Sequence, residues 1–210
     1  MTKVRVLSVQ YLASAAPSLC RQLGAPEGYP CLGLITTDCD DATYIALDEA
    51  TKAADVQVCY SRSFYGGAGN ASTPYAGEVL GILAGLTPGA VRSGMEAAVG
   101  ALDHLGFEMA GKVPYLACTV SSCGSFLAKE AGVPLGSALA YLIAPPLESM
   151  YAMDGALKAA DVTLCKLYTP PTETNFGGGL LTGTQSACSA ACGAFAEGVR
   201  QAAEHALGGA

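Results

Sequence analysis

The stretch Ala46-Leu-Asp-Glu-Ala-Thr-Lys-Ala-Ala-Asp-Val-Gln-Val-Cys59 occurs twice in this chain. Its second copy is Ala152-Met-Asp-Gly-Ala-Leu-Lys-Ala-Ala-Asp-Val-Thr-Leu-Cys165, and nine of the fourteen positions are identical at an offset of 106 residues. A second repeated pattern, Gly-x-Pro-x-Gly, covers residues 24–28 and again 132–136, at an offset of 108. Since both offsets are about half of the 210 residues, we interpret the chain as two copies of one folding unit, at 1–108 and 109–210.

The residues around each copy predict a strand, a helix and a second strand in close succession, which is a βαβ unit of the α/β class. In the first half these elements are expected at 31–37, from Asp40 or Asp41 to about 54, and 56–63. In the second half they are expected at 138–144, 145–160 and 162–168. The other elements expected are strands at 3–12, 77–85, 113–120 and 180–183, helices at 16–23, from 88, at 122–131 and at the end of the chain, a link at 106–112 and a loop at 169–179.

Composition limits the classes of function. A hydrophobic share of 51% with only 14% charged residues indicates a well-buried globular protein, and we expect an oligomer because little charged surface remains. The formal charge of −7 disfavours a nucleic-acid partner, which requires a basic face. No run approaches the roughly 20 apolar residues of a membrane span. The first residues do not resemble a signal peptide, so we expect a cytoplasmic protein.

Nine cysteines are present, and none of them forms a Cys-x-x-Cys pair. In a cytoplasmic protein, buried free thiols are the ordinary interpretation. Zinc and iron–sulfur sites show tighter pairing of ligands. We therefore predict no metal and no cofactor.

Three carboxylates stand out. Asp40 and Asp41 precede a helix, where the ordinary role is a helix cap. Glu78 is less usual, because it heads an apolar strand, where a carboxylate needs a partner or a wet cavity.

Two glycine-rich segments could bind phosphate, be ordinary surface loops, or move. Phe64-Tyr-Gly-Gly-Ala-Gly-Asn-Ala-Ser-Thr-Pro74 lacks the Lys-Ser/Thr ending of a phosphate-binding loop, so that signal is weak. Glycine allows a backbone to change conformation at low cost, which would suit a mobile loop at residues 66–70 and 177–179.

The duplicated motif resembles the Lys-Ala-Ala-(Asn/Asp)-Val segment of bacterial microcompartment shell proteins. Four longer stretches are similar to the EutL family of shell proteins, from ethanolamine-utilisation microcompartments. They are Gly33-Leu-Ile-Thr-Thr-Asp-Cys-Asp-Asp-Ala-Thr-Tyr-Ile-Ala-Leu-Asp-Glu-Ala-Thr-Lys52, Ala144-Pro-Pro-Leu-Glu148, Pro170-Pro-Thr-Glu-Thr-Asn-Phe176 and Leu181-Thr-Gly-Thr-Gln-Ser-Ala-Cys188. The resemblance covers nearly the whole chain.

That resemblance implies two tandem, circularly permuted BMC domains, each ferredoxin-like, in a protein without enzymatic activity. Three chains would form a pseudohexameric tile of a microcompartment shell in the cytoplasm, in contact with other shell proteins. The family has a central pore gated by loops and a smaller acidic channel in each subunit that holds ethanolamine.

The resemblance also implies roles for particular residues. Lys52 and Lys158 match the lysine at the tile edge, although each could be a solvated helix residue. The implied ethanolamine site consists of Asp40, Asp41, Glu78, Phe107, Thr174, Asn175 and Phe176. The implied loops of the central pore contain Tyr65, Gly66, Gly67, Ala68, Gly69, Asn70, Phe176, Gly177 and Gly178.

Three functions are weighed on this basis. The first is a shell tile that passes small molecules, for ethanolamine or a related amine. The second is a sensor in which an occupied small channel holds the central gate shut, which requires a ligand that prefers one gate state. The third, an enzyme or redox carrier, has the least support, because no catalytic arrangement surrounds His104 or His205.

Overall fold

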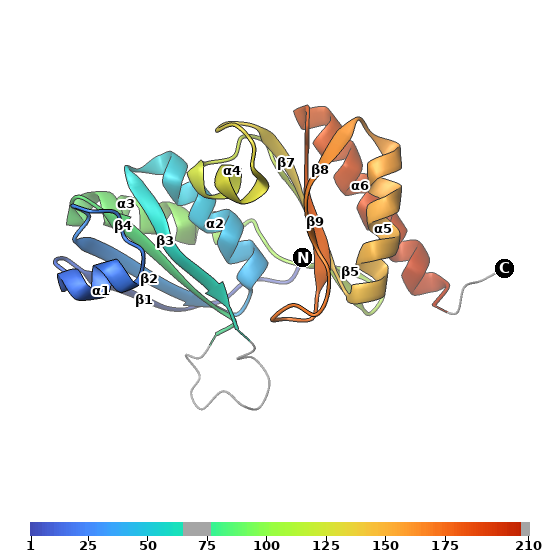
Figure 1. Cartoon of the computed structure of the whole chain (residues 1–210). Helices are drawn as coiled ribbons and strands as arrows, with labels where there is room; N and C mark the ends of the chain where they lie inside the picture. The colour runs from blue at the N-terminus through green and yellow to red at the C-terminus, as the bar shows by residue number, and fades with distance from the viewer. Residues whose placement is uncertain (65–76, 207–210) are drawn as a thin grey trace. The chain divides into compact units, whose positions relative to one another are not determined.

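The computed structural model describes residues 1–64 and 77–206 (Figure 1). Contacts divide the chain into two units. One, which we call the N-terminal unit, contains Lys3–Leu105 and the short segment Gly124–Leu127. The other, the C-terminal unit, contains Met1–Thr2, Gly106–Cys123 and Ala128–Ala210.

The N-terminal unit is built on a four-stranded sheet with the strand order β1-β2-β4-β3, in which all neighbours are antiparallel. Helices α2 and α3 cover one face, where Gly33 and Gly81 leave room for the side chains of Met95 and Leu47. The bounds are β1 Val6–Leu12, α1 Pro17–Gln22, β2 Cys31–Thr37, α2 Asp40–Ala53, β3 Val56–Ser63, β4 Val79–Gly85 and α3 Pro88–Leu102.

The C-terminal unit repeats this arrangement with one strand added at an edge, in the order β5-β6-β7-β9-β8. Its core lies between the sheet and helices α5 and α6, around the fully buried Phe195. The bounds are β5 Glu108–Ala110, β6 Val113–Val120, α4 Ser125–Ala131, β7 Ala138–Ala144, α5 Pro146–Ala159, β8 Val162–Tyr168, β9 Gly177–Gly183 and α6 Gln185–Glu204.

The two sheets share one topology. Strands β2 and β3 are both antiparallel to β4, so they run parallel to each other on either side of it, joined by α2. Strands β7 and β8 flank β9 in the same way, joined by α5. This split βαβ arrangement confirms the predicted α/β fold of two alike modules.

The outer strands carry the same irregularity in both units. The β3–β4 register shifts between Val58 and Tyr60, and the β8–β9 register shifts between Leu164 and Lys166. The residues at these shifts are Cys59 and Cys165, the last residues of the duplicated motif. A β-bulge therefore stands at the same position of each copy.

Two predictions about segments between strands were wrong. Residues 106–112 are not only a link, because Glu108–Ala110 forms β5 and turns through Gly111, at φ +61°, into β6. Gly177 and Gly178 are not in a loop: both are buried residues of β9 and pair with β7. A Cβ at Gly178 would meet the Leu142 carbonyl oxygen at 1.8 Å, so glycine is required there by a close backbone contact.

The helix cap expected from Asp40 or Asp41 is also absent from this position. The N-cap residue of α2 is Cys39, and its side chain accepts no capping hydrogen bond from the helix. Asp40 and Asp41 are instead the first two helical residues, and Asp40 Oδ1 accepts a hydrogen bond from the Asp41 N–H at 2.9 Å. Near the positive end of the helix, both carboxylates are still favoured electrostatically.

None of the helices among the described residues is long and apolar enough to cross a membrane. All nine cysteines are free thiols. Within residues 1–64 and 77–206, no cluster of three or more His, Cys, Asp or Glu side chains is placed to hold a metal ion.

Candidate functional site

The turn between β2 and α2 brings acidic side chains together in the N-terminal unit. We call Asp38, Asp40, Asp41 and Glu78 the acidic group. Asp40 and Asp41 are buried, with exposed fractions of 6% and 7%. Asp38 was missed by the sequence analysis, although its position two residues before Asp40 could have indicated it.

Two threonine hydroxyls fix this turn. The Thr37 and Thr43 hydroxyl oxygens lie 2.6 Å apart, and the Thr43 hydroxyl donates to the Cys39 carbonyl at 2.8 Å. The Cys39 N–H donates to Thr37 Oγ1 at 3.1 Å. The start of α2, and with it the carboxylates of Asp40 and Asp41, is thus held by bonds that the sequence analysis did not identify.

Glu78 reaches the same place from the start of β4. Its N–H donates to the Thr37 carbonyl and its own carbonyl accepts from the Phe64 N–H, both at 2.8 Å. The neighbouring Gly77 is needed, because a Cβ there would lie 2.1 Å from the Thr37 carbonyl oxygen. The backbone of Glu78 is therefore anchored beside the end of β2.

The charges of the acidic group act on one another. Burial, and then the charges of Asp40 and Asp38, raise the pKa of Glu78 from 4.5 to about 7. Burial also raises the pKa of the Asp40 carboxyl, and this is opposed by hydrogen bonds that include one from Ser63. Burial likewise raises the pKa of the Cys39 thiol, and the charges of Asp41, Asp40 and Glu78 add to that effect.

The side chain of Arg5 forms an ion pair at one edge of the acidic group. Arg5 donates from its backbone N–H to Asp38 Oδ1 at 2.8 Å and from Nε to Asp38 Oδ2 at 2.7 Å. The Arg5 side chain is 75% exposed, so water screens this pair. Arg5 thus offsets part of the charge of Asp38. Of the two neighbouring carboxylates, Asp40 raises the pKa of Glu78 more than Asp38 does.

Chemically, such a group is suited to a small cation that donates several hydrogen bonds. Carboxylates bound to an ammonium form short, charge-assisted hydrogen bonds. A cation placed there would also favour the ionised form of Glu78, since an opposite charge lowers the pKa of a carboxyl.

The other four residues of the expected ligand site lie in the C-terminal unit. The rings of Phe107 and Phe176 meet edge to face, with centroids 5.4 Å apart. Phe176 ends a turn in which its carbonyl accepts from Thr172 Oγ1 at 2.7 Å. In the same turn Asn175 is exposed and has φ +59°, while Thr174 is half-buried.

Of the residues expected at the central pore and the tile edge, the structure describes the two lysines of the edge but not the first pore loop. Residues 65–70, which include Tyr65 and Asn70, lie outside the described residues. Lys52 forms an ion pair with Glu49 on α2, and Lys158 forms one with Asp154 on α5, at 2.6 Å. Both lysines lie in the last turn of their helices, where the negative end of the helix dipole favours a positive charge.

Known proteins similar to this chain were found by sequence and by structure. A family model described as BMC domain matches residues 31–113. A protein of Clostridium perfringens named bacterial microcompartment shell protein EutL is 56% identical over 99% of this chain and 98% of its own length. The protein of the same name from Escherichia coli is 45% identical over 95% of this chain and 93% of its own length.

Among solved structures, the ethanolamine utilization protein EutL from Leptotrichia buccalis superposes with a TM-score of 0.96. It is 53% identical, and the match covers 99% of this chain and 98% of that one. Identity of this level over nearly the full length of both proteins establishes a shared family as well as a shared fold.

Proposed function

Because this chain belongs to the EutL family of bacterial microcompartment shell proteins, we propose that three copies form a shell tile with a gated central pore and that the acidic group binds ethanolamine. A shell protein acts by assembling and by controlling passage, so its chemistry is recognition rather than catalysis. The two tandem BMC domains assigned to 1–108 and 109–210 supply six modules to such a tile, two from each of three chains.

The observation that carries the ligand part of the proposal is the gathering of carboxylates at the start of α2, where Asp40 and Asp41 are buried and the Glu78 backbone is anchored to Thr37. Burial and the charges of Asp40 and Asp38 raise the pKa of Glu78 to about 7. Near neutral pH, this carboxyl is close to half protonated when no cation is bound. A protonated amine that donates to Glu78 and Asp40 stabilises their ionised forms and displaces the proton. Ethanolamine carries one ammonium and one hydroxyl on two carbons, and its ammonium matches this arrangement of acceptors.

The resemblance assigns Phe107, Thr174, Asn175 and Phe176 to the same ligand. Their chemistry supports that assignment: an aromatic face binds aliphatic carbons beside a cation, and a threonine hydroxyl or a backbone carbonyl accepts from an alcohol. We treat this part separately from the acidic group, and a Phe176→Ala variant tests it. A loss of ethanolamine affinity supports the participation of Phe176, and an unchanged affinity removes Phe176 from the site.

Calorimetry with ethanolamine tests the acidic group directly. We expect the Glu78→Gln variant to bind about tenfold or more weakly, because a charge-assisted hydrogen bond is replaced by a neutral one. Glu27→Gln, which removes an exposed carboxylate in the same unit, is the matched control and should bind like the unchanged protein. Equal affinity of the unchanged protein and Glu78→Gln would contradict the proposal.

Two further ligands separate the alternatives. Ethylene glycol, which has the size of ethanolamine but no ammonium, should not bind. A binding constant for 1-amino-2-propanol equal to or tighter than that for ethanolamine would favour a compartment for a related amine.

The tile itself is tested by sedimentation and electron microscopy. We expect a trimer in solution that assembles into flat layers. Lys52→Ala and Lys158→Ala test the proposed tile edge: layers should be lost while trimers persist. A monomer for the unchanged protein would contradict the tile.

A further inference from the structure

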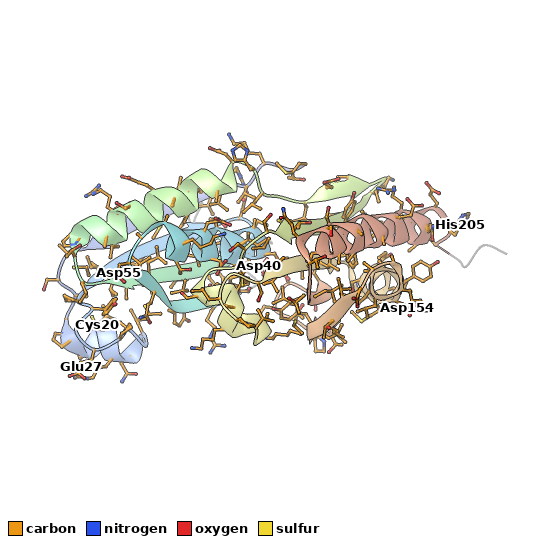
Figure 2. All side chains as sticks on the ribbon, turned by 90° about the horizontal axis from the view of Figure 1, so that it is seen from above. Cys20, Glu27, Asp40, Asp55, Asp154 and His205 are labelled. Carbon is orange, nitrogen blue, oxygen red and sulfur yellow. The ribbon has the colours of Figure 1, made fainter. Side chains whose placement is uncertain are left out.

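Two hydroxyl groups connect Asp40 to a second residue of its own helix. Asp40 is the first residue of α2 and is 6% exposed (Figure 2). The side chain of Ser63, the last residue of β3, forms a hydrogen bond with the Asp40 carboxyl. The Ser63 hydroxyl is also hydrogen-bonded to the hydroxyl of Tyr44, which lies one turn further along α2. We call Asp40, Ser63 and Tyr44 the polar chain.

The chemistry of these groups fixes the direction of the polar chain. An ionised carboxylate only accepts hydrogen bonds, so Ser63 donates its single hydroxyl proton to Asp40. The oxygen of Ser63 then accepts from Tyr44, whose phenol hydroxyl donates. Successive donors polarise one another and strengthen the last bond. In this direction the polar chain stabilises the ionised form of Asp40.

Ser63 has a large effect on the charge of Asp40. Burial raises the pKa of the Asp40 carboxyl, and among the hydrogen bonds that oppose burial the one from Ser63 has the largest effect. The other titratable groups around Asp40 are Asp41, Glu78 and the thiol of Cys39, all of which are acids. These neighbours offer no positive charge, so hydrogen-bond donors have to keep Asp40 ionised.

The ring of Tyr44 packs against a segment that is itself fixed. The rings of Tyr44 and Phe126 are tilted at 48°, with centroids 6.2 Å apart. On either side of Phe126, the N–H groups of Gly124 and Leu127 donate to the buried carboxylate of Asp48 at 2.6 and 2.8 Å. Packing and hydrogen bonds around a supporting side chain restrict its rotamer. The Tyr44 hydroxyl is therefore held toward Ser63.

The second copy of the module lacks the polar chain. At the offset of 106, the counterparts of Asp40, Tyr44 and Ser63 are Pro146, Met150 and Thr169. The carboxyl and the phenol are thus both replaced by groups that donate no hydrogen bond. The second copy nevertheless forms the same split βαβ arrangement of β7, α5, β8 and β9. The fold does not require the polar chain, which indicates a role in the site where Asp40 lies.

We propose that Tyr44 and Ser63 are positioning residues of the ligand site, which orient the Asp40 carboxylate and hold it ionised for the ammonium of ethanolamine. This proposal rests on the function proposed above and adds two residues that act through Asp40. A hydrogen bond between an ammonium and a carboxylate is strong because both groups are charged. Replacement of Ser63 or Tyr44 therefore weakens binding although neither side chain meets the ligand.

Calorimetry with ethanolamine is the first test. We expect Ser63→Ala to bind about tenfold more weakly and Tyr44→Phe about threefold more weakly, because each loses one hydrogen bond of the polar chain. Ser63→Thr keeps the hydroxyl and should bind like the unchanged protein. Threonine fits this position of the module, since Thr169 occupies it in the second copy.

Strand β3 also supplies matched controls. Ser61 lies two residues before Ser63, and its buried Oγ has no hydrogen-bond partner in the part of the chain that the structure describes. Ser61→Ala therefore removes a hydroxyl without removing a hydrogen bond. Tyr60→Phe removes a phenol hydroxyl from the same strand. Both controls should bind ethanolamine like the unchanged protein.

A titration of Asp40 in the absence of ligand is the second test. Nuclear magnetic resonance of isotope-labelled carboxyl carbons follows the aspartates with pH, and the signal lost in Asp40→Asn identifies Asp40. The pKa of Asp40 should be higher in Ser63→Ala and in Tyr44→Phe than in the unchanged protein, because the ionised form loses its donors. Ser63→Thr should restore the original pKa of Asp40, and Ser61→Ala should leave it unchanged.

The two measurements separate the possible failures. An unchanged pKa of Asp40 in both variants overturns the proposal, whatever the affinity does. Equal changes in Ser61→Ala also overturn it, because they would reflect a general loosening of β3. If the unchanged protein binds no ethanolamine while the pKa of Asp40 rises in the variants, the proposed ligand is wrong and the positioning of Asp40 by Ser63 and Tyr44 is supported.

Discussion

The carbonyl oxygen of Thr37 lies 2.1 Å from the point where a side chain at Gly77 would begin. The same oxygen accepts the N–H of Glu78 at 2.8 Å. The absence of a side chain at one residue therefore allows the next to place its carboxylate in the acidic group.

A Gly77→Ala variant should be destabilised by about 1–3 kcal/mol, because the added methyl group must push the ends of β2 and β4 apart. Urea unfolding at fixed protein concentration measures this change. Gly100→Ala is the matched control, since a Cβ at Gly100 meets nothing within 4 Å on helix α3. The control should gain roughly 0.5–1 kcal/mol from the better helix propensity of alanine. A stable Gly77→Ala variant would show that the strands separate at little cost.

The raised pKa of Glu78 predicts a pH dependence of stability. The folded protein holds this proton more tightly than the unfolded chain does, so the contribution is fully present below pH 4.5 and is lost as the pH rises through about 7. Glu78→Gln lacks this titration. The free energy of unfolding of the unchanged protein should therefore fall relative to that of Glu78→Gln between pH 4.5 and 8, and parallel curves would contradict a buried, raised carboxyl.

Ethanolamine should reverse that trend. Since the ligand requires ionised Glu78, its affinity should increase as the pH rises from about 6 to 8 and then level off. Calorimetry in two buffers of different ionisation enthalpy measures the protons released on binding. A pH-independent affinity would leave Asp40 and Asp41 as candidate ligands but exclude Glu78.

The sequence analysis identified most elements of the fold because burial and turn signals agreed locally. Strands β2, β3, β6, β7 and β8 have the predicted bounds. Strand β5 was missed because three residues are too few for a pattern. It depends on a partner, as the Tyr115 hydroxyl on β6 donates to Glu108 at 2.9 Å.

The glycines at the start of β9 were misassigned for a related reason. Three successive glycines are typical of a loop, yet Gly179 is needed because a Cβ would lie 2.3 Å from the Lys166 carbonyl oxygen.

In the acidic group, the sequence analysis identified Asp40, Asp41 and Glu78. The hydroxyl pair that orders the turn, Thr37 and Thr43, depends on a six-residue reach that no local pattern reveals.

Removal of the Asp48 carboxylate should release the segment Gly124–Leu127 from α2, because this carboxylate accepts the N–H groups of Gly124 at 2.6 Å and of Leu127 at 2.8 Å. Asp48→Ala leaves two buried N–H groups without acceptors, at a cost of about 2–5 kcal/mol in the free energy of unfolding. Hydrogen exchange at Gly124 and Leu127 should accelerate more than exchange in the core strand β4. Asp161→Ala is the control. Asp161 is an exposed residue directly before β8 in the C-terminal unit, so its replacement should change neither quantity.

The half-buried thiol of Cys59 and the buried thiol of Cys192 should react slowly. Burial raises the pKa of Cys59 and of Cys192 to about 11. At pH 8 only about a thousandth of each is thiolate, so alkylation by iodoacetamide should be roughly a hundredfold slower than in the unfolded protein. Mass spectrometry of alkylated peptides with time measures these rates, and urea-unfolded protein is the control. Fast labelling of Cys59 in folded protein would mean that its strand opens.

The matched bulges at Cys59 and Cys165 bear on the ancestry of the chain. A single added residue in a strand turns every later side chain to the opposite face, so such an irregularity is difficult to acquire or lose without rebuilding both faces. Its presence in both modules dates it to before the gene doubled. The connections from β3 to β4 and from β8 to β9 have since diverged in length, whereas both modules have kept the inherited bulge at the same position.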